Sequence, residues 1–389
     1  MDLLTILSKY FEVYTDREVL EKYSMDYSYI SSEFQTIKKL PTAVISIKSE
    51  DEVKSVIELA NEYSFNIIVR GAGTNTLGET VPMKENTVVL DITKFKGFEK
   101  KKDVLISRPG NDFNDTGIHD FPVIPTSFYM ATIGGYAATG AYGFGALKNG
   151  AIWDNLISVE VYTPKGFYEL SGSDLFYITL SAGTTGIITR VKVRLVNRKD
   201  KKINVIKRGF NSLSEALDFA LDVMGEAEFL SIRNYKMAKE INPEYNWGKW
   251  NVIYGVYGNE GDESYAIKDI ITSFAGSYFT VVSKRKVNYN SRNISLDELQ
   301  KDYKKIEDTK SMVNMEFAKS SGKVFARTYI LDFNEMPELG YYVNLHSYRV
   351  NDIVKIDFTN HELRVKKLIE FKEKVDPEDI LNPGKLIIS

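Results

Sequence analysis

Hydrophobic and polar positions follow strand and helix periods in turn from residue 41 onward. Residues 44–47 and 67–69 are short apolar runs that predict strands. Between them, apolar residues at 53, 56, 57 and 60 recur at helical spacing, and Ser49 with Glu52 forms a capping box at the start of that helix. The second strand is followed at once by a glycine-rich loop, so this stretch predicts a βαβ unit with a loop beyond the carboxyl end of its strand.

Further short strands are predicted up to residue 195. Residues 88–91, 104–107, 157–162 and 167–170 are apolar or alternating, and a short helix is expected over 174–180. From Ile187 to Leu195 apolar side chains alternate with Arg190, Lys192 and Arg194, which indicates a strand with one face in water.

A charged stretch at residues 197–202 marks the first predicted domain boundary. Beyond it the pattern reads strand 203–209, helix 212–224, strands 229–233 and 250–257, helix 262–274 and strand 278–283. This βαββαβ order predicts a ferredoxin-like α+β domain. Residues 284–345 show only one clear helix, near 295–308, and a final helix is expected over 361–374. We therefore expect three segments: 1–198, 199–360 and 361–389, the last returning to the first domain.

Composition and charge exclude several functional classes. The 389 residues carry a net charge of −3, which argues against a nucleic-acid partner, because such proteins need a basic surface. The chain has no cysteine, which removes disulfides, thiolate nucleophiles and cysteine-ligated metals. We expect no signal peptide and no transmembrane segment. The expected location is the cytoplasm, with peripheral contact to a membrane left open.

Three glycine-rich segments, 70–78, 132–145 and 183–186, carry the candidate chemistry. Glycine permits positive φ and a close approach of the backbone to a ligand, so successive N–H groups can converge on an anion. Any one of these segments would read equally well as a turn, but three in one domain favour a cofactor that contains a pyrophosphate. A dinucleotide-binding Gly-x-Gly-x-x-Gly and a Walker A motif are both absent from the sequence.

The order of these motifs resembles a known family. The motifs are Arg70-Gly-x-Gly-Thr74, Pro109-Gly110, Ala131-Thr-Ile-Gly-Gly135, Asp154-Asn155, Pro164-x-Gly166, Ser181-x-Gly-Thr-x-Gly-Ile-Ile-Thr189 and Leu381-Asn-Pro-Gly-Lys385. Together they resemble the PCMH-type FAD-binding domain of the vanillyl-alcohol-oxidase superfamily, in its glycolate oxidase and D-lactate dehydrogenase branch. The resemblance implies an α+β fold with a two-lobed FAD-binding domain and a ferredoxin-like cap domain that takes the substrate.

The resemblance also assigns the residues that would bind FAD. They are Arg70, Gly71, Ala72, Gly73, Thr74, Asn75, Thr76 and Gly78 in the first loop, Pro125, Ser127, Thr132, Ile133, Gly135 and Ala138 in the second, Gly183, Gly186 and Ile188 in the third, and Asn382 and Lys385 in the tail. Some relatives attach FAD covalently through a histidine at the position of Thr74. A threonine cannot form that bond, so we expect non-covalent FAD.

The implied activity is oxidation of a small 2-hydroxy acid, D-lactate or glycolate, to the 2-keto acid, with electrons leaving to an external acceptor. The histidine-rich segments that supply a metal site and a base in the hydroxyacid dehydrogenases are missing. His346 is therefore the candidate base, and a metal site that would use it with His361 and Glu362 is not adopted.

Arg233 and Arg327 are the candidate carboxylate-binding residues, because a guanidinium offers a bidentate fork. The partner of Arg327 is either the substrate or a structural aspartate. Two other functions stay open: an alcohol, sugar or aldonolactone oxidase of the same superfamily, and a non-catalytic FAD-binding subunit of an electron-transfer complex. A homo-oligomer and a partner subunit are likewise both open.

Overall fold

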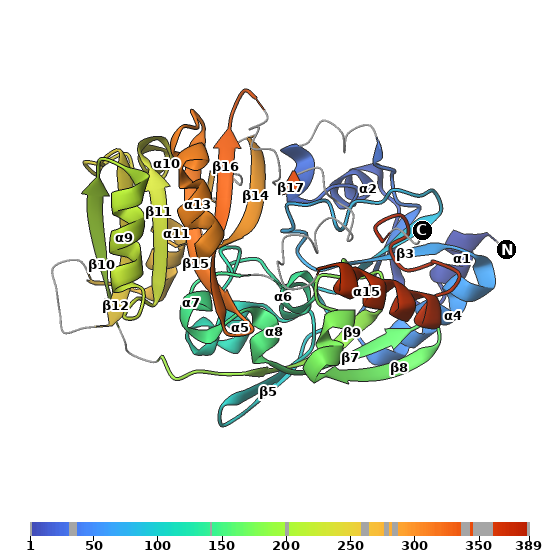
Figure 1. The fold of residues 1–389 in the computed structure, drawn as a ribbon. Coiled ribbons are helices and arrows are strands. Elements are labelled where there is room, and N and C mark those ends of the chain that lie inside the picture. Colours follow the sequence, from blue (N-terminus) through green and yellow to red (C-terminus); the bar gives the residue numbers. More distant parts are fainter. Residues whose placement is uncertain are drawn as a thin grey trace.

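The structure is a computed structural model of the chain. It describes residues 2–30, 37–140, 142–198, 202–257, 264–275, 280–281, 287–335, 343–344 and 361–386. Three sheets organise these residues, two in the N-terminal half and one in the segment from residue 203 onward. Figure 1 shows the third sheet on one side and the first two sheets, with the C-terminal helix, on the other.

The first sheet has four strands in the order β1-β2-β4-β3. Its strands are β1 (Glu12–Tyr14), β2 (Ala43–Ser46), β3 (Asn66–Arg70) and β4 (Thr87–Asp91), and the helices around it are α1 (Leu3–Leu7), α2 (Arg17–Tyr23), the 3-10 turn η1 (Tyr27–Ile30) and α4 (Glu50–Tyr63). Strands β2 and β3 both pair in parallel with β4, so the predicted βαβ unit is present with β4 inserted between its strands. Ser49 caps α4 by accepting a hydrogen bond from the amide of Glu52.

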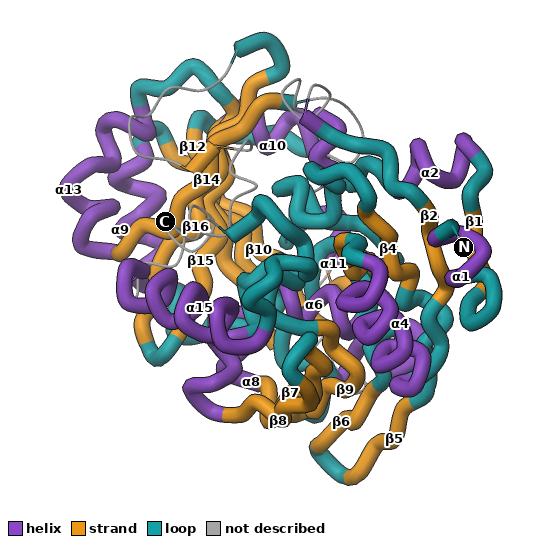
Figure 2. Tube along the Cα trace, turned by 90° about the vertical axis from the view of Figure 1, so that its right-hand side faces the viewer, coloured by secondary structure: helices purple, strands orange, loops and turns teal. Residues whose placement is uncertain are grey.

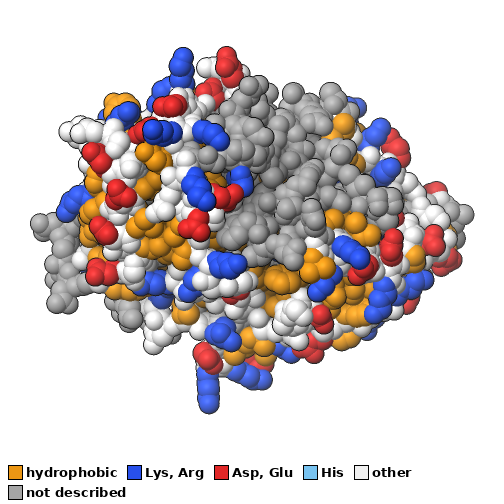
Figure 3. All heavy atoms as spheres, viewed as in Figure 1, with side chains coloured by type: hydrophobic (Ala, Val, Ile, Leu, Met, Phe, Trp, Pro, Cys, Tyr) orange, Lys and Arg blue, Asp and Glu red, His pale blue; other side chains and the backbone are white. Residues whose placement is uncertain are grey.

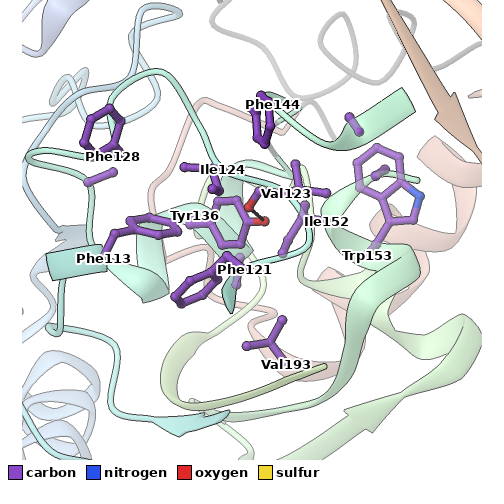
Figure 4. Close-up of a cluster of buried hydrophobic side chains, with 14 of the residues drawn as sticks. Phe113, Phe121, Val123, Ile124, Phe128, Tyr136, Phe144, Ile152, Trp153 and Val193 are labelled. Carbon is purple, nitrogen blue, oxygen red and sulfur yellow. Dashed lines mark hydrogen bonds between the residues drawn. The ribbon is translucent and has the colours of Figure 1, made fainter. Parts of the chain in front are cut away.

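The second sheet is antiparallel, in the order β5-β6-β9-β7-β8. Its strands are β5 (Phe98–Lys101), β6 (Val104–Ser107), β7 (Leu156–Thr163), β8 (Gly166–Ser171) and β9 (Ile187–Arg194), and its short helices are α5 (Phe113–Thr116), η2 (Ile118–Asp120), α6 (Ile133–Thr139), α7 (Ala146–Asn149), α8 (Ile152–Asn155) and η3 (Gly172–Tyr177). A cluster around Tyr136 forms the core of this half (Figure 4). The rings of Phe113 and Phe121 pack near it, and its hydroxyl donates to the carbonyl of Val123. This core holds α6 and therefore the second glycine-rich segment in place.

The third sheet has the order β13-β10-β12-β11-β15-β16-β14-β17, with antiparallel pairing throughout. Its strands are β10 (Ile203–Phe210), β11 (Phe229–Asn234), β12 (Trp250–Tyr257), β13 (Ser264–Tyr265), β14 (Asn288–Ser295), β15 (Met312–Ser320), β16 (Lys323–Asp332) and β17 (Val343–Asn344), and its helices are α9 (Leu213–Val223), α10 (Tyr235–Ile241), α11 (Ile267–Ser273) and α13 (Leu296–Glu307). The order β10-β12-β11 is that of the first three strands of a ferredoxin-like sheet.

The two faces of this sheet differ in chemistry. Helices α9 and α13 cover one face, where Ile232, Val313, Met315 and Ile330 are buried with the apolar sides of both helices (Figure 1). Side chains of a strand alternate between faces, so the residues between these point to the opposite face. That face carries polar side chains on β11, β14, β15 and β16, and it is turned toward the N-terminal half.

The C-terminal segment returns to the first sheet. Helix α15 (His361–Val375) packs on η3, with the ring of Phe371 stacked on Tyr177 at 4.5 Å between centroids. After the helix, Leu381 forms a parallel bridge with Ile67 beside β3. Figure 2 shows α15 on the same side as α8 and the strands β7 and β8. The face of the molecule in Figure 3 carries interspersed side chains of both charges.

One predicted strand is wrong. The strand expected over 278–283 falls partly outside the described residues, and its described part, Thr280 and Val281, is helical. Val281 is buried beside Met237 and Tyr289, and the two-residue strand β13 occupies the place next to β10 that a fourth ferredoxin-like strand would take. At Val281, tertiary contacts therefore override the strand preference of a β-branched side chain.

Candidate functional site

A single cavity collects all three glycine-rich segments and one wall of the third sheet. It contains about 1660 Å³ of space free of protein atoms, including its open mouth. Its lining residues are Val69, Gly71–Leu77, Glu79, Thr80, Ile92, Pro125–Ser127, Ala131, Thr132, Gly134–Tyr136, Ala138–Gly140, Tyr142, Trp153, Ile178, Leu180, Ala182, Gly183, Gly186, Ile188, Asn293, Glu316, Arg327 and Tyr329. Segments from Val69 to Tyr329 thus share one concave surface, as ligand sites do.

The first loop, after β3, is shaped by two glycines. Gly73 has a φ of +69°, and a Cβ at Gly71 would lie 2.3 Å from the hydroxyl of Thr132, so this loop touches the second one directly. Arg70 does not line the cavity. Its guanidinium is buried behind the loop and donates to the carbonyl of Met25 at 2.6 Å. Asn75 fixes the far side of the turn by accepting from the amide of Leu77 at 2.7 Å.

The second and third loops bring further main chain to the same cavity. Thr132 caps α6 by accepting from the amide of Gly135 at 3.2 Å. In the third loop Ala182 and Gly183 both have positive φ, 52° and 70°, and a Cβ on Gly183 would meet no protein atom. Main chain is therefore directly accessible in this part of the wall, at Gly183.

The C-terminal segment ties the first loop to the third. The side-chain amide of Asn382 donates to the carbonyls of Glu79, at 2.8 Å, and of Ala182, at 2.5 Å. Lys385 is fully buried and donates to the carbonyl of Gly78. These two residues do not line the cavity, but they hold together two of the loops that do.

A buried charged cluster lies beneath the first loop. Burial raises the pKa of Glu79 to about 8, and the charge of Asp26 raises it further, whereas Lys385 and Asn75 oppose the rise. Burial also lowers the pKa of Lys385 to about 8, against the charges of Asp26 and Glu79. Desolvation therefore dominates at both groups and disfavours their charged forms.

The raised pKa of Glu79 predicts a stability that falls with pH. Because the pKa in the fold lies above the ordinary 4.5, the protonated form stabilises the fold. That contribution is full below about pH 4.5 and is lost as the pH rises through about 8. We expect Glu79→Gln to flatten the fall of the melting temperature between pH 5 and 8. Glu58→Gln, at an exposed position of α4, is the control, and equal pH slopes in all three proteins would contradict the assignment.

The third sheet contributes a polar wall to the cavity. Glu316 on β15 is paired with Arg327 on β16, and Arg327 is paired with Asn293 on β14. Paired residues of antiparallel strands share one face, so these three side chains form a row, and all three line the cavity. The guanidinium of Arg327 lies 5.1 Å from the ring centroid of Tyr142, which comes from the N-terminal half, and 5.5 Å from that of Tyr329. The cavity is therefore closed by both halves of the chain.

The structure brings most of the predicted site residues together. Of those assigned by the resemblance, Arg70, Gly78, Ile133, Asn382 and Lys385 lie behind the lining, and the other cofactor-binding candidates line the cavity. Arg327 lines it as well. Arg233 is fully buried in the third sheet and does not reach the lining. His346 lies outside the described residues. Within the described part of the chain, no three histidine, aspartate or glutamate side chains gather at a distance suited to a metal ion.

Sequence reasoning missed three polar wall residues, Asn293, Glu316 and Tyr329. They belong to the stretch 284–345, where no clear period was recognised. Met315 and Phe317, on either side of Glu316, belong to the apolar face, so alternation on β15 was the available signal. This alternation could have placed Glu316 on the face opposite the apolar one. It could not have shown that the polar face lines this cavity.

The lining residues fit an FAD molecule. A diphosphate suits closely approaching glycine main chain with threonine and serine hydroxyls, which the loops at 71–76, 127–135 and 183–186 provide. A flat, largely apolar ring suits side chains such as Tyr142, Trp153, Leu180 and Ile188. Among the described lining residues only Glu79, Glu316 and Arg327 carry ionisable charges, so the main chain is left to contact the anionic part.

Comparison with known proteins agrees with this fit. Residues 41–170 match the family model described as an FAD binding domain. The chain is 26% identical over 208 residues to the glycolate oxidase subunit GlcD of Bacillus subtilis, which covers 49% of this chain and 43% of that protein. It is 26% identical over 224 residues to a D-lactate dehydrogenase of Archaeoglobus fulgidus, covering 52% and 50% of the two chains. These alignments span at most half of the length of either relative.

A solved structure extends the similarity of fold beyond the matched domain. An alkyldihydroxyacetonephosphate synthase structure superposes with a TM-score of 0.72, at 18% sequence identity, over 98% of this chain and 84% of that one. At this identity the likeness concerns the fold, and it includes the third sheet as well as the first two. The expected arrangement of a two-lobed FAD-binding domain with an α+β cap domain is confirmed.

Proposed function

We propose that this chain, which belongs through residues 41–170 to the PCMH-type FAD-binding proteins, is an FAD-dependent oxidoreductase that oxidises a small 2-hydroxy acid to the 2-keto acid. D-Lactate and glycolate are the first candidates. One observation carries the proposal: the glycine-rich loops of the FAD-binding domain and the polar row Asn293–Arg327–Glu316 of the cap domain line the same cavity. A substrate held by that row therefore shares one enclosed space with the cofactor.

FAD, when bound, supplies a two-electron acceptor that can take up a hydride. The residues of the chain bind and orient the other reactant. Arg327 offers a planar guanidinium for a carboxylate, and the flanking rings of Tyr142 and Tyr329 limit the freedom of its side chain. The names of the glycolate oxidase and D-lactate dehydrogenase relatives support a hydroxy acid as the reactant.

Anaerobic reduction of the bound flavin tests this function. We expect D-lactate, glycolate or a related 2-hydroxy acid to bleach the visible absorbance of the purified protein in the absence of oxygen. Bleaching by sugars or simple alcohols but not by hydroxy acids would replace the proposal with the alcohol or sugar oxidase alternative. Reduction only by another protein would indicate the non-catalytic subunit of an electron-transfer complex.

Arg327→Lys is expected to weaken binding of a carboxylate ligand about 10-fold to 100-fold, because an ammonium cannot make the bidentate contact of a guanidinium. Oxalate is a suitable probe, titrated against the flavin absorbance of the oxidised protein. Lys319→Arg, on the same sheet and away from the lining, serves as the control. Equal oxalate affinity in wild type and Arg327→Lys would remove Arg327 from the substrate site.

The flavin is expected to be released on denaturation. Thr74 lines the cavity at the position where some relatives carry the histidine that bonds FAD, and its hydroxyl cannot form that bond. After treatment with SDS or acid, we expect the yellow colour in the filtrate and no fluorescent band with the polypeptide. A fluorescent polypeptide band would contradict non-covalent binding.

The proposed oxidation needs an external electron acceptor to reoxidise the flavin. A homo-oligomer or a partner subunit is part of the same proposal. In the part of the chain that the structure describes, we find no helix with the length and apolar character that crossing a membrane requires. Cytoplasmic location and peripheral attachment to a membrane both remain proposals.

A further inference from the structure

The polar row of the cap domain contains an acid that the preceding assignment leaves without a role. Glu316 lines the cavity beside Arg327 and belongs to the same face of the sheet. Its position is set from behind by two other residues of that face. The side-chain amide of Asn314 donates to a carboxylate oxygen of Glu316 at 3.0 Å, and the Nε of Arg233 donates to the amide oxygen of Asn314 at 3.2 Å.

Arg233 places a buried positive charge behind Asn314 and Glu316. The guanidinium is fully buried and also donates to the carbonyl of Phe274. Burial lowers the pKa of Arg233 to about 10, and the charge of Glu316 is what opposes this fall. A buried cation without a nearby anion is costly, so the charge of Arg233 favours an ionised Glu316. The relay from Arg233 through Asn314 holds a carboxylate at the cavity wall in one orientation.

Asn293, at the other end of the row, indicates that a polar group of a ligand binds on this wall of the cavity. Its side chain is only 2% exposed, yet neither its amide nitrogen nor its amide oxygen has a hydrogen-bond partner among the residues that the structure describes. Buried polar atoms of folded proteins are almost always paired. A ligand with a group that both donates and accepts, such as a hydroxyl, would pair them.

We propose that Glu316 is the catalytic base of the site, accepting the proton of the substrate hydroxyl, with Asn314 and Arg233 as its positioning residues. This inference rests on the proposed function. The substrate loses a hydride from its carbinol carbon to the two-electron acceptor named above and a proton from its hydroxyl to a carboxylate oxygen of Glu316. The carbon–oxygen single bond becomes a carbonyl, and Glu316 becomes a neutral acid.

In this row, different residues bind the substrate and accept its proton. Arg327, between Glu316 and Asn293, takes the carboxylate of the substrate. The hydroxyl then lies toward Glu316, and a 2-hydroxy acid with a polar group beyond those of lactate and glycolate would place that group toward Asn293. We therefore expect Asn293→Ala to raise KM with little change in kcat, whereas changes at Glu316 lower kcat.

The test uses the FAD-containing protein and whichever 2-hydroxy acid reduces the wild type. Glu316→Gln should lower the rate of anaerobic flavin reduction about 10²-fold to 10⁴-fold, the usual range for a general base. FAD content and the oxalate affinity should stay within about 3-fold of wild type. Glu226→Gln, the same change at an exposed position of the cap domain, should leave all three quantities unchanged.

Two further variants extend the test, and the first of them, Glu316→Asp, keeps it decisive if Glu316→Gln fails to fold around Arg233. Glu316→Asp retains the charge but shortens the side chain, and it should reduce the flavin at least about 10-fold more slowly. Asn314→Ala should slow reduction about 10-fold in the wild-type background and have no further effect in the Glu316→Gln background. A merely structural role for Asn314 would produce equal effects in both backgrounds.

The outcomes separate the two proposals. If hydroxy acids reduce the wild type and Glu316→Gln or Glu316→Asp reduces at the wild-type rate, Glu316 is not the base, and the proposed function stands. If no hydroxy acid reduces the wild type, the proposed function fails and the base assignment fails with it.

Discussion

Asp376→Ala is expected to lower the free energy of unfolding by about 3–5 kcal/mol, the range found when one partner of a buried ion pair is removed. Asp376 and Lys372 are both fully buried and form an ion pair one helical turn apart, at the end of α15. Asp376 also accepts hydrogen bonds from the amides of Ile380, at 3.1 Å, and Leu381, at 2.8 Å. Its removal leaves the two amides without their acceptor. It also leaves the buried ammonium of Lys372 with only the partly exposed carboxylate of Asp379, at 2.8 Å, and the carbonyl of Leu381, at 2.9 Å.

The same substitution should weaken the binding of FAD. The turn that Asp376 organises leads directly into Asn382 and Lys385, which hold the first and third loops of the cavity. If the turn loosens, these contacts weaken and the loops lose their fixed spacing. Flavin content after gel filtration is the measurement, made beside urea unfolding monitored by circular dichroism.

Glu370→Ala is the matched control on the same helix. Glu370 pairs with Lys366 at 4.0 Å, also one turn apart, but both side chains are largely exposed, at 61% and 73%. Exposed ion pairs of this kind contribute little to the free energy of unfolding. We therefore expect no measurable change in that free energy or in flavin content. Equal effects of the two substitutions would show that the buried pair does not anchor the C-terminal turn.

Local signals in the sequence were sufficient to predict much of the framework. Ser49 caps α4, the helix that it was expected to begin, and the helices expected to start near residues 212 and 295 are capped by Ser212 and Ser295. Periodicity and capping depend on residues within a few positions of one another, so they can be recognised without knowing the tertiary structure.

The site was predictable only in part, because its two walls differ in how they are made. The FAD-binding wall is main chain from glycine turns, and glycine in a motif is visible in the sequence. The cap wall depends on register: Glu316 meets Arg327 and Asn293 only because β15, β16 and β14 pair as they do. Such long-range pairing is not encoded in any short window, which is why Arg327 was found as a charged residue in an apolar strand but its neighbours were not.

Arg233 is a second residue whose partner could not be predicted from a short window of sequence. A guanidinium in an apolar strand predicts an anionic partner, and a substrate carboxylate was the partner expected. In the structure Arg233 is enclosed in the sheet, with Asn314 and Phe274 as hydrogen-bond acceptors and Glu316 as the nearby charge. Sequence alone shows that the charge needs compensation, but it does not show whether the compensation comes from within the protein.

Gly183→Ala is expected to abolish or strongly reduce FAD binding while leaving the protein folded. The backbone at Gly183 has a φ of +70°, and a Cβ there would meet no protein atom. The new methyl group therefore points into open space beside the cavity that Gly183 lines, and any clash arises with the ligand. We expect at least a 10-fold loss of affinity, measured by quenching of tryptophan fluorescence, since Trp153 lines the same cavity.

Two other glycines separate the possible causes of that loss. Gly172→Ala places alanine at a φ of +56°, also with no atom within reach of its Cβ, but outside the cavity lining, so it carries only the backbone strain of about 1–2 kcal/mol. Gly73→Ala, at a φ of +69°, adds a protein clash, because its Cβ would overlap the guanidinium of Arg70.

The three glycine variants should differ in FAD affinity and in stability in a way that is specific to a cavity that holds the cofactor against glycine main chain. Gly172→Ala should bind FAD as the wild type does, with a slightly lower melting temperature. Gly183→Ala should show the same small loss of stability as Gly172→Ala together with a large loss of FAD. Gly73→Ala should lose FAD and more stability than either, because displacing Arg70 also disturbs its bond to the carbonyl of Met25. Normal FAD affinity in both Gly73→Ala and Gly183→Ala would mean that the cofactor does not lie against these loops.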